Sequence, residues 1–107
     1  MRASLLLVLA VAVHAKAASV SGAGNVDIHF TRSGSGGANI ILVHGWICDS
    51  SYWRNQVAEL AADNTVIAID LAGHGESGSN RDNWSITAFG EDVAAVVDAQ
   101  NMDEVIL

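Results

Sequence analysis

Two short apolar runs that end abruptly in turn residues are the clearest pattern along this chain. Residues 40–43 (IILV) lead into His44-Gly45-Trp46, and residues 66–69 (VIAI) lead into residues 70–77 (DLAGHGES). Continuous β-branched runs of this length are typical of strands buried on both faces, as in parallel sheets covered by helices. We therefore predict central strands at residues 39–44 and 65–69, with function expected at their carboxyl ends.

A weaker alternation precedes the first apolar run. Residues 25–31 alternate between apolar and polar side chains, which predicts a half-exposed strand with His29 on its solvated face. The glycine-rich residues 33–37 then predict a tight hairpin that leads to the strand at residues 39–44. Residues 18–24 are small and polar, and we interpret them as a leader into the fold.

Apolar residues at spacings of three and four predict two amphipathic helices. The first begins near Tyr52, is capped by one of the polar residues 49–51, and ends at residues 63–64. The second runs from its N-cap Ser85 to about Gln100. Its predicted inner face comprises Ile86, Phe89, Val93, Val96 and Val97, and its outer face comprises Glu91, Asp92 and Asp98.

The order of these elements indicates the fold class. Residues 105–107 resemble the beginning of another buried strand, so strands alternate with helices along the chain. This alternation predicts an α/β fold with right-handed crossovers and a mostly parallel sheet.

The N-terminal segment has the three parts of a secretory signal peptide. Met1-Arg2 forms a short basic region, residues 3–13 are small or apolar apart from Ser4, and Ala15-Lys16-Ala17 has the pattern of a cleavage site. The apolar run is too short to span a bilayer, which takes about 20 residues. We therefore predict a signal peptide at residues 1–17, an incomplete domain at residues 18–107, and a secreted or periplasmic protein without a stable membrane span.

The charge balance argues against nucleic acid as a partner. The chain of 107 residues has a net charge of −7, and loss of residues 1–17 leaves three basic and twelve acidic side chains, a net charge of −9. The three remaining arginines are dispersed, so no basic patch is available for a phosphate backbone. We interpret the acidic surplus as solvated surface.

The residues that often hold metals or cofactors give no coherent pattern. The histidines are scattered and no two share a helix face, so we predict no metal site. Gly73, Gly75 and Gly78 fit the dinucleotide pattern G-x-G-x-x-G, but that motif must open a helix directly after its strand, and here a polar loop follows. We therefore expect no cofactor. Cys48 is the single cysteine, and it is either a buried small side chain or the partner of a cysteine outside this sequence.

Two strings of residues resemble the N-terminal part of an α/β-hydrolase. Residues 44–56 (HGWICDSSYWRNQ) resemble the loop and helix that follow a central strand in that family, and residues 70–77 resemble its D-x-x-G-x-G-x-S turn. In that turn Asp70 is expected to accept hydrogen bonds from the local backbone. The resemblance covers roughly residues 26–107, about the first third of the fold, and implies a mostly parallel sheet with flanking helices.

The resemblance also implies a set of site residues. The backbone N–H of the residue after His-Gly, here Trp46, is one donor of the oxyanion hole in that family. His44, Gly45, Gly73 and Gly75 are expected to shape the loops around it. The second donor follows the nucleophile of a G-x-S-x-G turn. No such turn occurs in this sequence, so none of the catalytic triad is expected in it.

The expected function is hydrolysis of a small-molecule ester by a complete, exported enzyme to which these residues supply the oxyanion-hole loop. The 107-residue stretch alone is expected to be inactive. An epoxide or haloalkane hydrolase with an aspartate nucleophile is the alternative within the family, and the residue at the centre of the missing turn would separate the two. A non-catalytic truncated product is the alternative from another class, and a nucleotide-binding domain is a weaker one.

Processing of the signal peptide is the first testable prediction. Exported protein should begin Ala18-Ser19-Val20, because signal peptidase cuts after a small-x-small triplet. N-terminal sequencing of the exported protein measures this directly. Exported protein that still carries Met1 would contradict the prediction.

Overall fold

A computed structural model describes residues 3–5 and 14–107 of the chain. Most of the predicted signal peptide, namely residues 1–2 and 6–13, lies outside the described residues. Within the described residues the elements are four β-strands, two α-helices and two short 3-10 helices. In chain order they are β1 (Lys16–Ser21), η1 (Ala23–Asn25), β2 (Asp27–Ser33), β3 (Asn39–Val43), η2 (Ser50–Trp53), α1 (Arg54–Leu60), β4 (Thr65–Ile69) and α2 (Ile86–Ala99).

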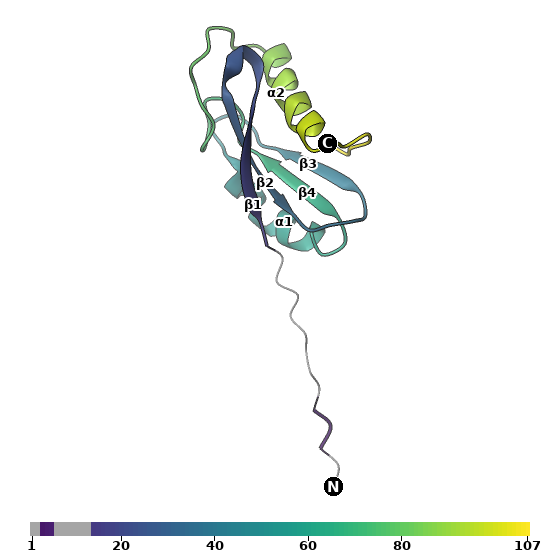
Figure 1. The fold of residues 1–107 in the computed structure, drawn as a ribbon. Coiled ribbons are helices and arrows are strands. Elements are labelled where there is room, and N and C mark those ends of the chain that lie inside the picture. Colours follow the sequence, from purple (N-terminus) through teal and green to yellow (C-terminus); the bar gives the residue numbers. More distant parts are fainter. Residues whose placement is uncertain (1–2, 6–13) are drawn as a thin grey trace.

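The strands form one mixed sheet in the order β1-β2-β4-β3 (Figure 1). β1 pairs with β2 and β2 with β4 in antiparallel fashion, whereas β3 and β4 are parallel. On the other edge of β3, Ile106 forms a parallel bridge with Ile40, which extends the parallel part. The predicted α/β fold class is therefore confirmed, with the parallel pairing confined to β3, β4 and this bridge.

A hairpin was predicted at residues 33–37, between the strands that the structure shows as β2 and β3. This prediction is wrong, because β4 lies between β2 and β3 in the sheet. The glycine-rich residues 34–37 instead pass against the turn that precedes β4. Gly34 and Gly37 have positive φ, and a side-chain carbon at either position would overlap backbone carbonyl oxygens of residues 61–64. Thr65 donates from its backbone N–H to the Ala38 carbonyl and from its hydroxyl to the Gly36 carbonyl. These contacts direct the chain past the end of β4. The glycines therefore allow the connection from β2 to cross to the far side of β4, and they do not form a hairpin turn.

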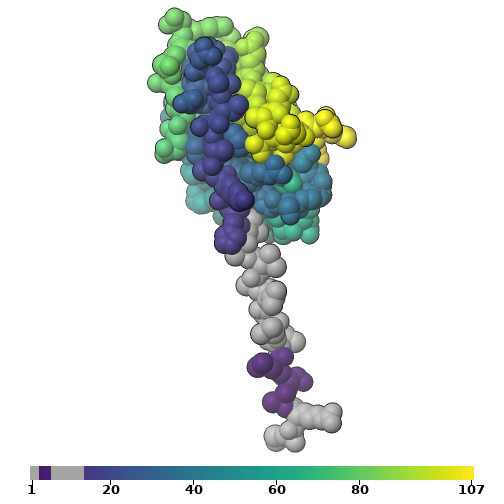
Figure 2. Space-filling model, in the orientation of Figure 1, coloured from purple at the N-terminus to yellow at the C-terminus, as the bar shows by residue number. Residues whose placement is uncertain are grey.

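The predicted leader at residues 18–24 is also wrong, because these residues contribute to β1 and η1. Six residues of β1 pair in register with β2, from Lys16 opposite Arg32 to Ser21 opposite Asp27. Five of the six β1 side chains are exposed, and the strand lies on the surface beside α2 (Figure 2). Backbone pairing at a sheet edge needs little side-chain burial, so hydrophobic patterning gave no indication of this strand.

The core lies on both faces of β4, all five residues of which are buried. Alternate side chains of a strand point to opposite faces, and Ile67 and Ile69 pack in one cluster with Val96 of α2. The helix α1 also contacts β4, and Ala61, which directly follows this helix, is buried. The buried cluster comprises Val26, Ile28, Phe30, Ile41, Ile67, Ile69, Ala72, Val96 and Met102.

The buried face of α2 is rotated from the predicted one. Its fully buried residues are Ala88, Asp92 and Val96, whereas Ile86, predicted to face inward, is 87% exposed. Phe89, Val93 and Val97 are partly buried against the core, in agreement with the prediction. Ser85 caps the helix as predicted, because its hydroxyl accepts the Ala88 N–H at 3.1 Å.

Asp92 was predicted to be solvated, but it is 0% exposed and forms a buried ion pair with Arg81. Arg81 Nη1 lies 2.9 Å from one carboxylate oxygen and 2.7 Å from the other, and the Ala23 backbone N–H donates to the first at 2.9 Å. The guanidinium also lies over the rings of Trp84 and Phe89, about 5 Å from each centroid. This pair joins η1, the loop before α2 and α2 itself, which explains why an aspartate occupies the inner face.

Asp70, directly after β4, is a second buried aspartate and is 2% exposed. One carboxylate oxygen accepts the Ser50 backbone N–H at 2.8 Å, and the other accepts the Glu76 N–H at 3.0 Å and bonds His29 Nδ1 at 3.1 Å. Burial acts to raise the pKa of Asp70, but these donors outweigh it and hold the pKa below its ordinary value of 3.8. His29 is therefore half-buried and hydrogen-bonded, not solvated as predicted.

Removal of the Asp92 charge should destabilise the fold strongly. Asp92→Asn leaves the Arg81 guanidinium buried without its counter-charge, and breaking such a pair typically costs about 3–5 kcal/mol. Asp98→Asn, at an exposed position of the same helix, is the matched control and should change the unfolding free energy by less than about 0.5 kcal/mol. Urea unfolding measures both. Equal stability of the two variants would show that the ion pair contributes nothing.

The contribution of Asp70 should depend on pH. A carboxylate whose pKa is lowered by folding stabilises the protein above the unfolded-state pKa, and this stabilisation is lost as pH falls through the folded-state pKa. Asp70→Asn should therefore lower the unfolding free energy at pH 7 by about 1.5–3 kcal/mol, and the gap from wild type should narrow below pH 4. Asp103→Asn, which changes an exposed aspartate, should show no gap at either pH. A gap that is the same at pH 7 and pH 3 would refute the assigned role of the Asp70 charge.

Candidate functional site

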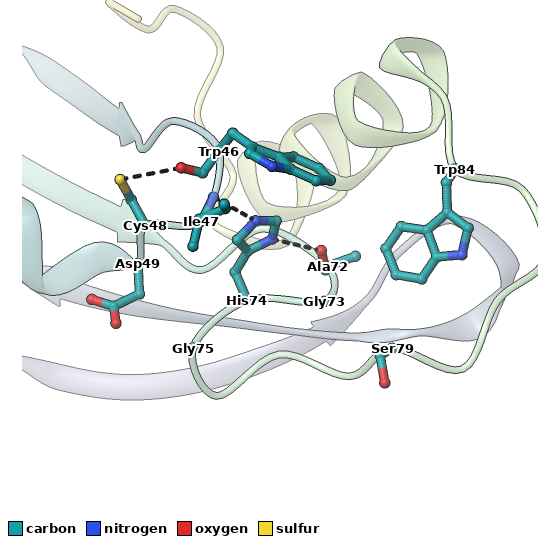
Figure 3. A pocket seen from close by; sticks show the side chains of 10 residues that line it. All are labelled: Trp46, Ile47, Cys48, Asp49, Ala72, Gly73, His74, Gly75, Ser79 and Trp84. Atoms are coloured by element: carbon teal, nitrogen blue, oxygen red, sulfur yellow. Dashed lines mark hydrogen bonds between the residues drawn. The ribbon is translucent and has the colours of Figure 1, made fainter.

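The candidate site lies where β3 and β4 end. Because these strands are parallel, the loops that follow them, residues 44–49 and 70–85, emerge at the same edge of the sheet. Together they line a pocket of about 610 Å³ (Figure 3). The lining residues are Trp46, Ile47, Cys48, Asp49, Ala72, Gly73, His74, Gly75, Ser79 and Trp84.

His44 joins the two loops through both of its ring nitrogens. Its Nδ1 lies 2.8 Å from the Gly45 carbonyl oxygen, and its Nε2 accepts the Leu71 backbone N–H at 3.0 Å. These partners assign the proton to Nδ1 and leave Nε2 as an acceptor. The side chain is buried, so His44 holds the loops together and has no nitrogen free to act on a substrate.

Trp46 presents a free backbone donor at the end of β3. Within residues 14–107 its N–H makes no hydrogen bond, and its side chain is 77% exposed. A side-chain carbon added at the preceding Gly45 would meet no atom within 4 Å. The loop shape therefore does not require glycine at position 45, and the space that a side chain would occupy there is open.

Ile47 adopts an unusual backbone conformation in the same loop. Its φ is +61°, in the left-handed region that a β-branched residue rarely occupies, and its side chain is 80% exposed. Such a conformation costs on the order of 1–3 kcal/mol and persists only where surrounding contacts impose it. The Ile47 N–H donates to His74 Nε2 at 3.3 Å, across from the other loop.

The loop after β4 turns back tightly at Gly73 and Gly75, which have φ of +78° and +50°. A side-chain carbon at Gly75 would overlap the Asp70 carboxylate, and one at Gly73 would press on the Trp84 ring. The Ser77 hydroxyl completes the turn, because it donates to the Asp70 carbonyl and accepts the His29 backbone N–H. The residues of the D-x-x-G-x-G-x-S string therefore serve one compact turn around Asp70.

Cys48 and Asp49 form the remaining side of the pocket. The Cys48 thiol is free and half-buried, and it donates to the Trp46 carbonyl at 3.5 Å. Asp49, one of the three predicted caps, caps the 3-10 helix η2 by accepting the Ser51 N–H at 2.8 Å, whereas α1 begins only at Arg54 and has no side-chain cap. Hydrogen bonds from the Ser51 hydroxyl and backbone N–H hold the pKa of Asp49 below its ordinary value.

A second cavity, of about 590 Å³ and mainly apolar, lies on the other side of Trp46. It extends from the carboxyl end of β3 to α2 and includes Leu71, Phe89, Val93 and Leu107 in its lining. Trp46 and His74 line both cavities. The free Trp46 N–H therefore belongs to a loop that borders a mixed polar pocket and an apolar one.

The described residues contain an unpaired backbone hydrogen-bond donor, the Trp46 N–H, but no activated nucleophile. No histidine ring nitrogen in residues 14–107 bonds a Ser, Thr or Cys side chain. The same residues contain no group of three metal-binding side chains. No helix in the described part of the chain has the length and apolarity needed to cross a membrane.

Sequence reasoning missed two features of this site. The contact of His74 with Ile47 joins residues 27 positions apart, and although both lie in the two family-like strings, nothing in the sequence indicates that they meet. The convergence of Ser50, Glu76 and His29 on Asp70 likewise depends on strand order. The D-x-x-G-x-G-x-S string was the only indication of the second feature.

Comparisons with known proteins agree with this geometry. The chain is 39% identical over 69 residues to the dihydrolipoyllysine-residue acetyltransferase component of the acetoin cleaving system of Pseudomonas putida, over 64% of this chain and 19% of that protein. Its fold is similar to that of a haloalkane dehalogenase of Agrobacterium tumefaciens, with a TM-score of 0.74, 32% identity, and coverage of 85% of this chain and 31% of the other. It is also similar to an esterase of Thermogutta terrifontis, with a TM-score of 0.72, 27% identity, and coverage of 80% and 32%.

The chain thus spans between a fifth and a third of the length of these proteins. The family model described as the alpha/beta hydrolase family matches residues 40–107, which include both loops of the candidate site. On the strength of this match and the fold, the chain belongs to the alpha/beta hydrolase family.

Proposed function

We propose that this chain is the N-terminal part of an exported ester hydrolase and that the Trp46 backbone N–H is one donor of its oxyanion hole. The observation that carries the proposal is the unpartnered Trp46 N–H at the carboxyl end of β3, between two cavities. In acyl transfer, negative charge develops on the carbonyl oxygen of the substrate. A preorganised N–H directed at that oxygen stabilises the transition state more than the ground state.

The strand edge beside β3 supports this proposal. The Ile41 N–H donates to the Ile106 carbonyl at 2.8 Å, and the Ile106 N–H donates to the Asn39 carbonyl at 2.9 Å. A strand that continued from Ile106 in this register would run parallel to β3 and end beside the loop of His44-Gly45-Trp46. A nucleophile turn that followed such a strand would face the Trp46 N–H and supply the second donor.

The Trp46 N–H suits an acyl substrate, because the carbonyl oxygen of an ester becomes an oxyanion that a backbone N–H can stabilise. The similar esterase structure supports the same class. The similar haloalkane dehalogenase favours a second candidate, in which an aspartate occupies the nucleophile turn and the substrate is a haloalkane or an epoxide. The identity of the residue at the centre of that turn distinguishes the two.

Export remains part of the proposal. Cleavage after Ala17 would remove the pairs of Lys16 with Arg32 and of Ala17 with Thr31, and would leave the other four β1 pairs intact. Most of β1 therefore persists in a processed chain. We further propose that residues 18–107 by themselves hydrolyse no ester, because they hold no histidine paired with a nucleophile, and that the complete enzyme needs no metal or organic cofactor.

A proline substitution tests the role of the Trp46 N–H in the complete enzyme. Trp46→Pro removes both the indole and the N–H, whereas the matched control Trp46→Ala removes the indole alone. Loss of one oxyanion donor typically lowers turnover about 10²–10³-fold. We expect this loss in kcat for ester hydrolysis in Trp46→Pro relative to Trp46→Ala, and a change mainly in KM for Trp46→Ala relative to wild type.

Thermal unfolding of each variant shows whether the fold is retained. Residues 18–107 alone, assayed with the same activated ester, provide the inactive baseline. Equal kcat values for folded Trp46→Pro and Trp46→Ala would refute the oxyanion role. A complete wild-type enzyme that releases halide or opens an epoxide but hydrolyses no ester would favour the second candidate.

A further inference from the structure

The strained backbone at Ile47 needs an explanation that its side chain does not give. The side chain is 80% exposed, so no burial compensates for the positive φ at this β-branched residue. Within its own loop, the nearest stabilising contact is the turn in which the Cys48 N–H donates to the Gly45 carbonyl at a long 3.3 Å. The remaining contact is the hydrogen bond from the Ile47 N–H to His74 Nε2.

The His74 ring is itself held in place by three neighbours. Its Nδ1 lies 3.0 Å from the Ala72 carbonyl, which assigns the ring proton to Nδ1 and leaves Nε2 as an acceptor. Its ring packs edge-on against the Trp46 indole, with centroids 5.6 Å apart, and lies 5.0 Å from the His44 ring. Figure 3 shows the His74 side chain between the loop of Ile47 and the backbone of Ala72. The acceptor offered to Ile47 is therefore fixed in position.

This contact distinguishes two consecutive backbone donors. The Ile47 N–H is bonded to His74, whereas the Trp46 N–H has no partner in residues 14–107. The Ile47 N–H lies in the peptide plane between Trp46 and Ile47, and this plane meets the plane of the Trp46 N–H at the Trp46 Cα. If the loop relaxed at Ile47, the first plane would rotate, the torsion angles at Trp46 would change with it, and the Trp46 N–H would turn. The orientation of the free donor therefore depends on the acceptor that holds its neighbour.

We propose that His74 is a positioning residue, whose Nε2 holds the strained Ile47 backbone so that the Trp46 N–H, rather than the Ile47 N–H, is directed at the substrate oxygen. This proposal rests on the proposed oxyanion role of Trp46. His74 itself does not touch the reacting atoms. A misplacement of about 1 Å in a catalytic group can cost on the order of 100-fold in rate, so the contact affects turnover more than substrate binding.

Amide hydrogen exchange tests the contact without reference to catalysis. In the wild-type complete protein the Ile47 amide should exchange more slowly than the Trp46 amide, because only the former is hydrogen-bonded. Equal exchange at the two amides would overturn the proposal, even if the oxyanion role of Trp46 held. Because this readout needs no activity, it also separates a failure of the proposal from a failure of the proposed ester hydrolysis.

Two matched variants of His74 then test its effect on turnover. His74→Gln keeps an acceptor near the position of Nε2 but loses the ring, whereas His74→Phe keeps a ring but loses the acceptor. We expect His74→Phe to lower kcat for ester hydrolysis by about 10- to 100-fold with KM changed less than about twofold, and to abolish the slow exchange at Ile47. His74→Gln should restore most of both.

A change at Ile47 provides a second line of evidence. Glycine adopts positive φ without strain, so Ile47→Gly should recover part of the activity that His74→Phe loses. Equal activity of His74→Phe and wild type would refute the proposal, as would equal losses in the glutamine and phenylalanine variants. If His74→Phe does not fold, the exchange comparison in the wild-type protein and the His74→Gln variant still decide the question.

Discussion

The carboxylate of Asp70 connects the segments on which the candidate site depends. Its donors come from β2, from the start of η2 and from the turn after β4. A buried carboxylate is tolerated only when such donors replace the water it has lost, and the three donors at Asp70 do so and hold its pKa below the ordinary value. Gly75 is part of the same arrangement, because any side chain there would occupy the space of the carboxylate.

Once the turn after β4 is fixed in this way, two histidines join it to the loop after β3. His44 extends from the β3 loop to the Leu71 N–H, and His74 extends from the β4 loop to the Ile47 N–H. Each uses one ring nitrogen for its own loop and the other for the facing loop. The consequence is a loop of defined shape in which the Ile47 N–H is paired and the Trp46 N–H has no partner among residues 14–107. A preorganised donor of this kind is what the stabilisation of an oxyanion requires.

The fold class, the two central strands and the N-cap at Ser85 could be predicted, because they depend on local patterns of β-branched and capping residues. The strand order could not, because the short glycine-rich connection after β2 looks the same whether it closes a hairpin or crosses another strand. Asp92 was assigned to the wrong face of α2 for a related reason. The periodicity of the helix assigns an aspartate to the solvated face because its side chain is polar. In the structure Asp92 is buried, because Arg81 in the preceding loop supplies a buried counter-charge.

The sequence alone determined which residues carry the family's loops: the string from His44 to Gln56, the string from Asp70 to Ser77, and Trp46 as the residue after His-Gly. These are local features, because glycines, β-branched runs and capping side chains act on neighbouring residues. Only the tertiary structure decided that β4 separates β2 from β3, that His29 and Ser50 meet at Asp70, and that His74 accepts the Ile47 N–H. Each of these features joins distant parts of the chain. Parallel pairing of β3 with β4 brings the loops of Ile47, Ser50 and His74 to one edge of the sheet, whereas antiparallel pairing of β2 with β4 brings His29 to Asp70.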